Sequence, residues 1–216
     1  MTNSSNNFFS DYAARLTDIL AVTDWSIISK LAKDLHHCWE QKRQVFLCGN
    51  GGSAGNAIHL ANDYLYGIAK RTGKGLKVHA LSANPSVLTC LGNDIGYHRI
   101  FAEQLAVFGQ PQDILIVLSG SGNSPNIIAA LEQAKQMHIK SYAILGYSGG
   151  QSKLIADAAI HFPINDMQIA EDLQLIVGHM LMQWLYANQP HLISTVKDGT
   201  YTQKEGAYAQ VINHRQ

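Results

Sequence analysis

The sequence lacks the features that mark several classes of protein. Of its 216 residues only three are cysteines, and Cys38, Cys48 and Cys90 are an odd number set far apart in largely apolar surroundings. This pattern predicts reduced thiols buried as small hydrophobic side chains rather than a disulfide framework. No apolar run reaches the roughly 18 residues of a membrane-spanning helix, and residues 1–7 lack the basic and apolar regions of a signal peptide. We therefore expect a cytoplasmic protein with no membrane partner.

The sequence also has no excess of charge of either sign. Its 16 Lys and Arg residues balance its 16 Asp and Glu residues, which gives no electrostatic reason to expect nucleic acid as the main partner. With 46% hydrophobic residues, a chain of this length can bury one sizeable core, and we expect a single α/β domain.

Strand and helix patterns alternate from residue 44 onward. This order predicts a five-stranded parallel sheet with helices on both faces, a three-layer α/β/α fold. The expected strands are 44–48, 77–81, 113–118, 141–145 and 158–162. Polar loops rich in glycine or serine follow three of the first four strands, and Asn84-Pro85 after the second suits a helix start. Because ligands bind beyond the carboxyl ends of parallel strands, we expect these loops to converge on one crevice.

The two ends of the chain lie outside this alternation. Residues 8–42 have apolar positions at helical spacing and predict two helices, with Thr23 or Asp24 as the cap between them. These helices either form an assembly surface or pack on their own sheet. A last helix is expected from about Met167 to Tyr186, and residues 191–216 are predicted to form a polar C-terminal extension.

The first strand leads into a glycine-rich turn, Gly49-Asn50-Gly51-Gly52-Ser53, and then a helix. Ser53 is expected to cap this helix, whose free N–H groups would form an anion cradle. The turn fits one variant of the dinucleotide-binding pattern, but the second strand does not end in the acidic residue that a ribose needs, so we discount a dinucleotide. On the helix, His59 and Asp63 are four residues apart and share a face.

A second loop, Ser119-Gly120-Ser121-Gly122-Asn123-Ser124, combines three hydroxyl groups, two glycines and a helix start. Such a loop can bind a phosphate monoester without lysine, although an ordinary capped loop has the same composition. The chain has no G-x-x-x-x-G-K-[ST] motif for a nucleotide phosphate.

The last helix carries Glu171, Asp172 and His179 among apolar residues. Helical spacing mildly favours Asp172 as the carboxylate on the side of His179. If this helix packs beside the one with His59 and Asp63, two histidines and two carboxylates can enclose Zn²⁺ or a related ion. The alternative is that His179 is a hydrogen-bonded core residue and that Asp172 or Glu171 faces solvent near the helix start.

Four motifs in this order resemble one family. Residues 48–53 followed by His59, then Gly92-Asn93-Asp94, the loop 119–124, and a last helix with His179 resemble the phosphoheptose isomerases of the sugar isomerase (SIS) domain superfamily. The resemblance covers about residues 8–187 and implies one SIS domain. It also implies a homotetramer with sites between subunits, one Zn²⁺ per subunit, and interconversion of sedoheptulose 7-phosphate and D-glycero-D-manno-heptose 7-phosphate in lipopolysaccharide heptose biosynthesis.

The resemblance also implies roles for individual residues. Asp63 and His179 would be the catalytic acid–base pair. The metal ligands would be His59, Asp63, Glu171 and His179, so the resemblance selects Glu171 where spacing favours Asp172. The substrate contacts would be Asn50, Gly51, Gly52, Ser53, Asn93, Asp94, Ser119, Gly120, Ser121, Ser124 and Glu171.

The chain departs from the family pattern at three positions. The family has glutamate at Asp63, glutamine at Glu171 and an arginine within the segment Tyr66-Gly67-Ile68-Ala69. Isomerisation of a sugar phosphate through an enediol is the leading hypothesis. One alternative is a non-catalytic SIS protein that binds a phosphosugar or associates with the bacterial replication initiator. Another is an isomerase or lyase that acts on a different sugar phosphate.

Overall fold

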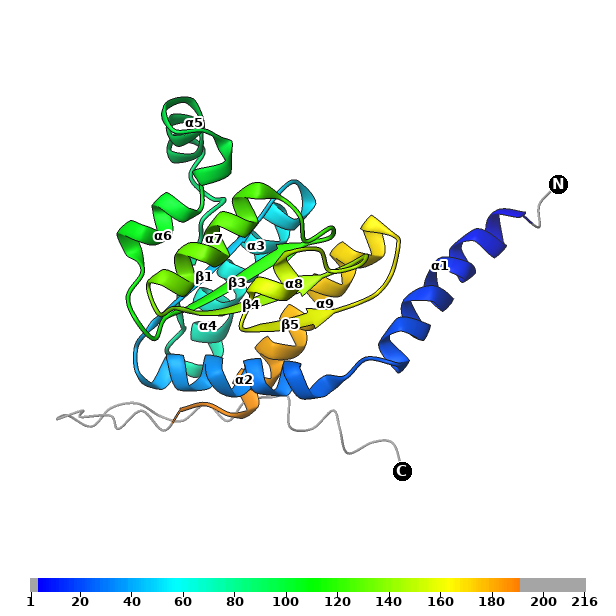
Figure 1. The fold of residues 1–216 in the computed structure, drawn as a ribbon. Coiled ribbons are helices and arrows are strands. Elements are labelled where there is room, and N and C mark those ends of the chain that lie inside the picture. Colours follow the sequence, from blue (N-terminus) through cyan, green and yellow to red (C-terminus); the bar gives the residue numbers. More distant parts are fainter. Residues whose placement is uncertain (1–3, 191–216) are drawn as a thin grey trace, which may run out of the picture.

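A parallel sheet of five strands lies at the centre of the computed structural model, which describes residues 4–190, with side chains from residue 7 (Figure 1). The strand order is β2-β1-β3-β4-β5. The strands are β1 (Gln44–Gly49), β2 (Lys77–Ala80), β3 (Ile114–Ser119), β4 (Lys140–Leu145) and β5 (Ala158–His161). Val45 of β1 is in register with Val78 of β2 and Ile114 of β3. The five predicted strands are confirmed, each to within one residue at either end.

Helices cover both faces of the sheet, which confirms the three-layer α/β/α fold. One face packs against α2 (Trp25–Glu40), α3 (Gly52–Asn62) and α9 (Met167–Ala187), and the other against α6 (Ala102–Phe108) and α7 (Pro125–Gln136). The shorter elements are η1 (Asp63–Gly67, a π-helix), α4 (Ile68–Thr72), α5 (Pro85–Asp94), η2 (Tyr97–Arg99, a 3-10 helix) and α8 (Ser152–Ile155). Alternate side chains of a buried parallel strand enter opposite layers, so Leu47 joins the α3/α9 side and Cys48 the α7 side.

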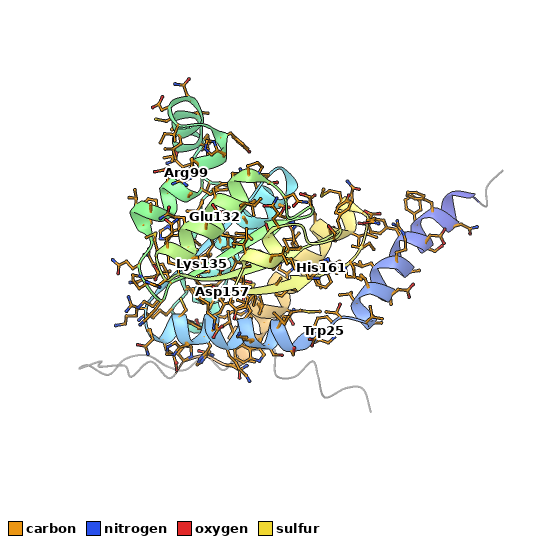
Figure 2. All side chains as sticks on the ribbon, viewed as in Figure 1. Trp25, Arg99, Glu132, Lys135, Asp157 and His161 are labelled. Atoms are coloured by element: carbon orange, nitrogen blue, oxygen red, sulfur yellow. The ribbon has the colours of Figure 1, made fainter. Side chains whose placement is uncertain are left out.

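The two N-terminal helices pack differently. α2 buries Leu31, Leu35 and Trp39 against the sheet of its own chain. α1 (Ser4–Ala21) projects from the body, and Trp25 begins α2 where the chain turns inward (Figures 1 and 2). Asp24 caps α2 by accepting a hydrogen bond from the N–H of Ser26. Of the two alternatives for these helices, packing on the chain's own sheet therefore holds for α2, and the assembly role of α1 stays a prediction.

Local predictions at caps and cysteines have mixed outcomes. Asn84 caps α5 as expected, but Ser53 does not cap α3, because Gly51 with φ +56° takes the N-cap position. Cys48 is buried as predicted, and burial raises the pKa of its thiol. Cys90 is exposed on α5, so the prediction of burial is wrong there, because α5 buries none of its residues.

None of the helices within residues 4–190 combines the length and apolar character needed to cross a membrane. The predicted C-terminal extension, residues 191–216, lies outside the described residues.

Candidate active site

The helices α3 and α9 pack in close contact because one of them carries a glycine at the crossing. A Cβ atom on Gly178 would lie only 2.2 Å from Cδ2 of Leu60 in α3. The Gly178 carbonyl also accepts a hydrogen bond from the hydroxyl of Tyr64 at 3.1 Å. Since Leu60 follows His59 and Gly178 precedes His179, this contact sets the distance between the two histidines.

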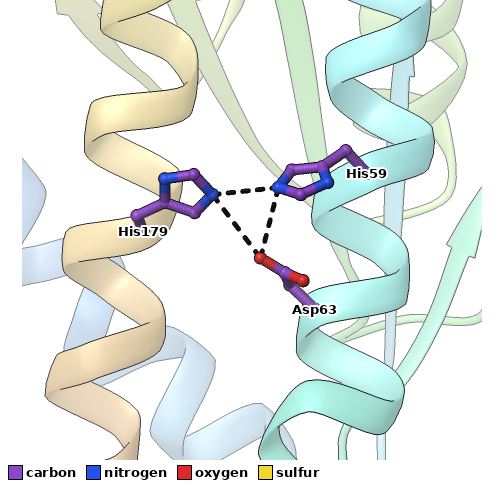
Figure 3. Close-up of side chains that lie close together, drawn as sticks. All are labelled: His59, Asp63 and His179. Carbon is purple, nitrogen blue, oxygen red and sulfur yellow. Dashed lines mark hydrogen bonds and ion pairs between the residues drawn. The ribbon is translucent and has the colours of Figure 1, made fainter.

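His59, Asp63 and His179 form a cluster between the two helices (Figure 3). The Nε2 atoms of the two histidines are 3.0 Å apart. Oδ2 of Asp63 lies 3.4 Å from Nε2 of His59 and 3.5 Å from Nε2 of His179. The side chain of His59 is 49% exposed, that of His179 45% and that of Asp63 16%. The structure thus brings three of the four predicted metal ligands together on a surface that ligands can reach.

Asp63 stands where the helix geometry changes. It begins the π-helix η1, in which the N–H of Ile68 bonds to the Asp63 carbonyl. Single π-turns of this kind are frequent at functional sites because they redirect side chains that a regular helix would place elsewhere. The carboxylate directed at the two imidazoles is therefore part of an irregular turn, which sequence periodicity does not reveal.

Glu171 lies apart from the cluster. It is two helical turns before His179 on α9, roughly 12 Å along the axis. Its carboxylate covers the start of α3, where the Ser53 hydroxyl approaches it at 3.5 Å and a Cβ on Gly52 would lie 2.2 Å from Oε2. A carboxylate of this chain thus occupies the helix start that the sequence predicts as an anion cradle.

The other expectations for the last helix have mixed outcomes: Asp172 faces solvent near the helix start, as one alternative held, but neither Asp172 nor the protein core is the partner of His179. Asp172 accepts a hydrogen bond from Tyr12 of α1 at 2.6 Å, so the spacing-based preference for Asp172 as the partner of His179 is wrong. The alternative of His179 as a core residue is also wrong, since its ring is half-exposed. Spacing fixes a direction around one helix axis, but neighbouring helices decide what lies there.

Gln174 was not found by sequence reasoning, although it supports the start of α3. Its side chain is 1% exposed, donates to the Ser53 hydroxyl at 3.0 Å and accepts from Asn56 at 3.0 Å. Asn56 also donates to the carbonyl of Glu171 at 3.0 Å. The sequence did carry a signal for this role, because Gln174 is a polar residue one turn after Glu171 in a largely apolar helix.

The serine-rich loop after β3 is held by its own hydroxyl groups. Ser119 Oγ accepts from the N–H of Gly122 at 3.1 Å, and Ser121 Oγ accepts from the N–H of Asn123 at 3.3 Å. Ser124 is the N-cap of α7, but its side chain makes no capping bond. The hydroxyl hydrogens of Ser119 and Ser121 are therefore left to donate to a ligand. Gly120 packs under Met167, where a Cβ would lie 2.5 Å from the sulfur atom.

A cleft of about 530 Å³ opens beside this loop, lined by residues from the turn after β1, from η2 and from the start of α7. Its residues are Asn50, Tyr97, His98, Ser124, Pro125 and Asn126. The segments that follow the neighbouring strands β1 and β3 thus meet at one edge of the sheet, and η2, which follows α5, lines the same cleft. Tyr97, His98 and Asn126 carry no motif of their own, and sequence reasoning missed them.

Asn93 and Asp94 belong neither to the histidine cluster nor to the residues that line the cleft. They are exposed at the end of α5, which projects from the body of the chain (Figure 1). Asn93 donates to the Asp94 carboxylate at 2.7 Å.

Comparison with known proteins decides the family. The model of the SIS domain family matches residues 7–146. A phosphoheptose isomerase of a Nitratiruptor species is 39% identical over 142 residues, which are 66% of this chain and 75% of that protein. The chain belongs to the phosphoheptose isomerase family of SIS-domain proteins. This membership confirms the predicted enzyme class, an aldose–ketose isomerase of the phosphoheptose isomerase type.

Solved structures of this family share the fold. A phosphoheptose isomerase from Francisella tularensis superposes with a TM-score of 0.80 at 28% identity, covering 87% of this chain and 100% of that one. A phosphoheptose isomerase from Neisseria gonorrhoeae gives 0.75 at 25% identity, covering 85% and 97%. The family model ends at residue 146, before α9 and His179, so the extent of the SIS domain to residue 187 stays a prediction.

Proposed function

We propose that the protein interconverts sedoheptulose 7-phosphate and D-glycero-D-manno-heptose 7-phosphate by proton transfer through an enediol. Membership of the phosphoheptose isomerase family supports the substrate class. The observation that carries the proposal is the cluster of His59, Asp63 and His179, whose ligand atoms all lie within 4.8 Å of one another.

The cluster fits a divalent metal such as Zn²⁺. In a tetrahedral site with bonds of about 2.0–2.1 Å, ligand atoms are about 3.3 Å apart, close to the 3.0, 3.4 and 3.5 Å separations of His59, Asp63 and His179. Two imidazoles and one carboxylate leave a fourth position open, as catalytic zinc sites do. When bound, the ion would polarise the carbonyl of the sugar and stabilise the negative charge that develops on its oxygen as the proton leaves the neighbouring carbon. Glu171, predicted both as a ligand and as a substrate contact, is better placed for the second role.

Residues of this chain would move the protons. Asp63 directs Oδ2 at the imidazoles, so the carboxylate can take a proton from one carbon and return it to its neighbour. His179 would exchange a proton with the sugar oxygens. The hydroxyl groups of Ser119, Ser121 and Ser124 would bind the phosphate, whose binding energy positions the distant carbons.

We also propose that the active form is a homotetramer in which subunits complete each other's sites. Three features support this: the half-exposed imidazoles, the projecting α5 with Asn93 and Asp94, and a cleft whose lining includes none of the three cluster residues. An adjoining subunit would cover the cluster and supply the missing contacts. The mass in solution, measured by light scattering, tests the assembly, and a monomer with full activity would refute it.

The test of function uses purified protein, sedoheptulose 7-phosphate and detection of the aldose by NMR. We expect conversion, and about one zinc per chain that is lost in His59→Ala and His179→Ala but not in the control His37→Ala, whose ring is 72% exposed and lies on α2. No aldose with or without added zinc would refute the isomerase. Metal-free protein that still binds the phosphosugar would instead indicate the non-catalytic alternative. Turnover of a different sugar phosphate alone would indicate another specificity.

A further inference from the structure

The amides of Asn50 and Asn126 form a reciprocal pair in the cleft beside the serine loop. Nδ2 of Asn50 donates to Oδ1 of Asn126 at 2.8 Å, and Nδ2 of Asn126 donates back to Oδ1 of Asn50 at 2.8 Å. Asn126 lies in the first turn of α7 and is 1% exposed, whereas Asn50 is half-buried at the end of β1. Of the two paired amides, that of Asn50 is therefore the one exposed to a ligand in the cleft, and that of Asn126 lies behind it.

A third residue completes the arrangement. The hydroxyl of Tyr97 donates to Oδ1 of Asn50 at 3.0 Å. An amide oxygen has two lone pairs, and both are now used, so Asn50 retains one N–H group for a ligand. Asn50 comes from the turn after β1, Tyr97 from η2 and Asn126 from the start of α7, and their hydrogen bonds hold these three segments in one geometry.

We propose that Asn126 and Tyr97 are positioning residues that act on the substrate through Asn50. The inference rests on the proposed function, in which Asn50 contacts the sugar phosphate. An unrestrained asparagine side chain samples several rotamers and loses that freedom when a ligand binds. Here the reciprocal pair fixes the amide before binding, so the N–H of Asn50 is already directed into the cleft. Asn126 lines the cleft, but it is only 1% exposed and its amide pairs with that of Asn50, so Asn50 presents the more exposed amide to a ligand.

A double-mutant cycle tests this assignment through kcat/KM with sedoheptulose 7-phosphate. Loss of hydrogen bonds of this kind costs roughly 2- to 10-fold, so we expect Asn126→Ala to lower kcat/KM by about 10-fold and Tyr97→Phe by about 3-fold. In an Asn50→Ala background, each second substitution should change kcat/KM by less than about 2-fold, because the group it positions is gone. Tyr66→Phe, at an exposed tyrosine of η1, is the matched control and should have no effect in either background.

Two further measurements separate positioning from damage to the fold. The inhibition constant of inorganic phosphate should stay within about 2-fold of wild type in each variant, because the serine loop is intact. If Asn126→Ala does not fold, the Tyr97→Phe cycle carries the test, since Tyr97 is 62% exposed and loses only a hydroxyl group.

Equal losses in the wild-type and Asn50→Ala backgrounds would overturn the inference, as would no loss in wild type. A wild-type protein that does not turn over sedoheptulose 7-phosphate refutes the proposed function alone. The same cycle is then measured as the Kd of that sugar phosphate by calorimetry, with the same non-additivity expected. Absence of binding would overturn both proposals.

Discussion

Gly178→Ala tests whether the contact between α3 and α9 builds the histidine cluster. The added Cβ would lie 2.2 Å from Cδ2 and 2.7 Å from Cδ1 of Leu60, which is 1% exposed. Carbon atoms pack at about 3.5 Å or more, so either Leu60 repacks or the helices separate by roughly 1 Å. The His59–His179 separation of 3.0 Å would then grow beyond what a shared metal ion allows.

A control substitution at a second glycine separates the cost of overpacking from the gain in helix propensity. Overpacking a core costs about 1–3 kcal/mol, while Gly→Ala inside a helix contributes about 1 kcal/mol of stability. Gly178→Ala should therefore lose about 0–2 kcal/mol. Gly55→Ala on α3, where a Cβ meets nothing within 4 Å, should gain about 0.5–1 kcal/mol. Urea unfolding in a chelator measures both without a contribution from metal binding.

Zinc affinity, measured by competition with a chromophoric chelator, gives the functional readout. We expect Gly178→Ala to weaken binding by about 10- to 100-fold and Gly55→Ala to leave it unchanged. Leu60→Ala added to Gly178→Ala should restore part of the affinity by making room for the new methyl group. Wild-type zinc affinity in Gly178→Ala, or no recovery in the double variant, would refute the reasoning.

Three further perturbations test other parts of the molecule. Asp166→Asn removes the carboxylate whose pKa is held below its ordinary value by the backbone N–H that it caps and by Arg15. A carboxyl group with a lowered pKa stabilises the fold at pH values above its unfolded pKa, and this contribution is lost as the pH falls through its folded pKa. Urea unfolding should therefore show a deficit at about pH 7 that shrinks as the pH is lowered through the folded pKa, and a deficit independent of pH would contradict this. Tyr12→Phe removes the bond to Asp172 that raises the pKa of Tyr12 to about 12, and amides of α1 should exchange with solvent roughly 2- to 10-fold faster; unchanged exchange would count against the contact. Zinc at about 100 times its Kd should stabilise the wild type by about 2.7 kcal/mol, visible as a raised Tm, and an equal shift in His59→Ala would place the metal elsewhere.

The sequence by itself determined the sheet and its loops. The strands are short apolar runs bounded by turn residues, signals that depend on neighbours in the chain, and the predicted bounds hold to within one residue. Helical spacing likewise put His59 and Asp63 on the same side, although Asp63 lies just after α3 as the first residue of η1. Glycine- and serine-rich loops at the carboxyl ends of strands indicated where the cleft lies, because parallel strands bring those ends to one edge.

Only the tertiary structure decided which side chains meet across elements. Spacing favoured Asp172, yet Asp172 bonds to α1 and Glu171 covers the start of α3. The pairing of Asn126 with Asn50 likewise joins residues 76 positions apart. The physical reason is that periodicity gives a direction around one helix axis, whereas contact depends on how closely a second element approaches. At the histidine cluster, α3 and α9 approach closely because Gly178 has no Cβ atom that would clash with Leu60.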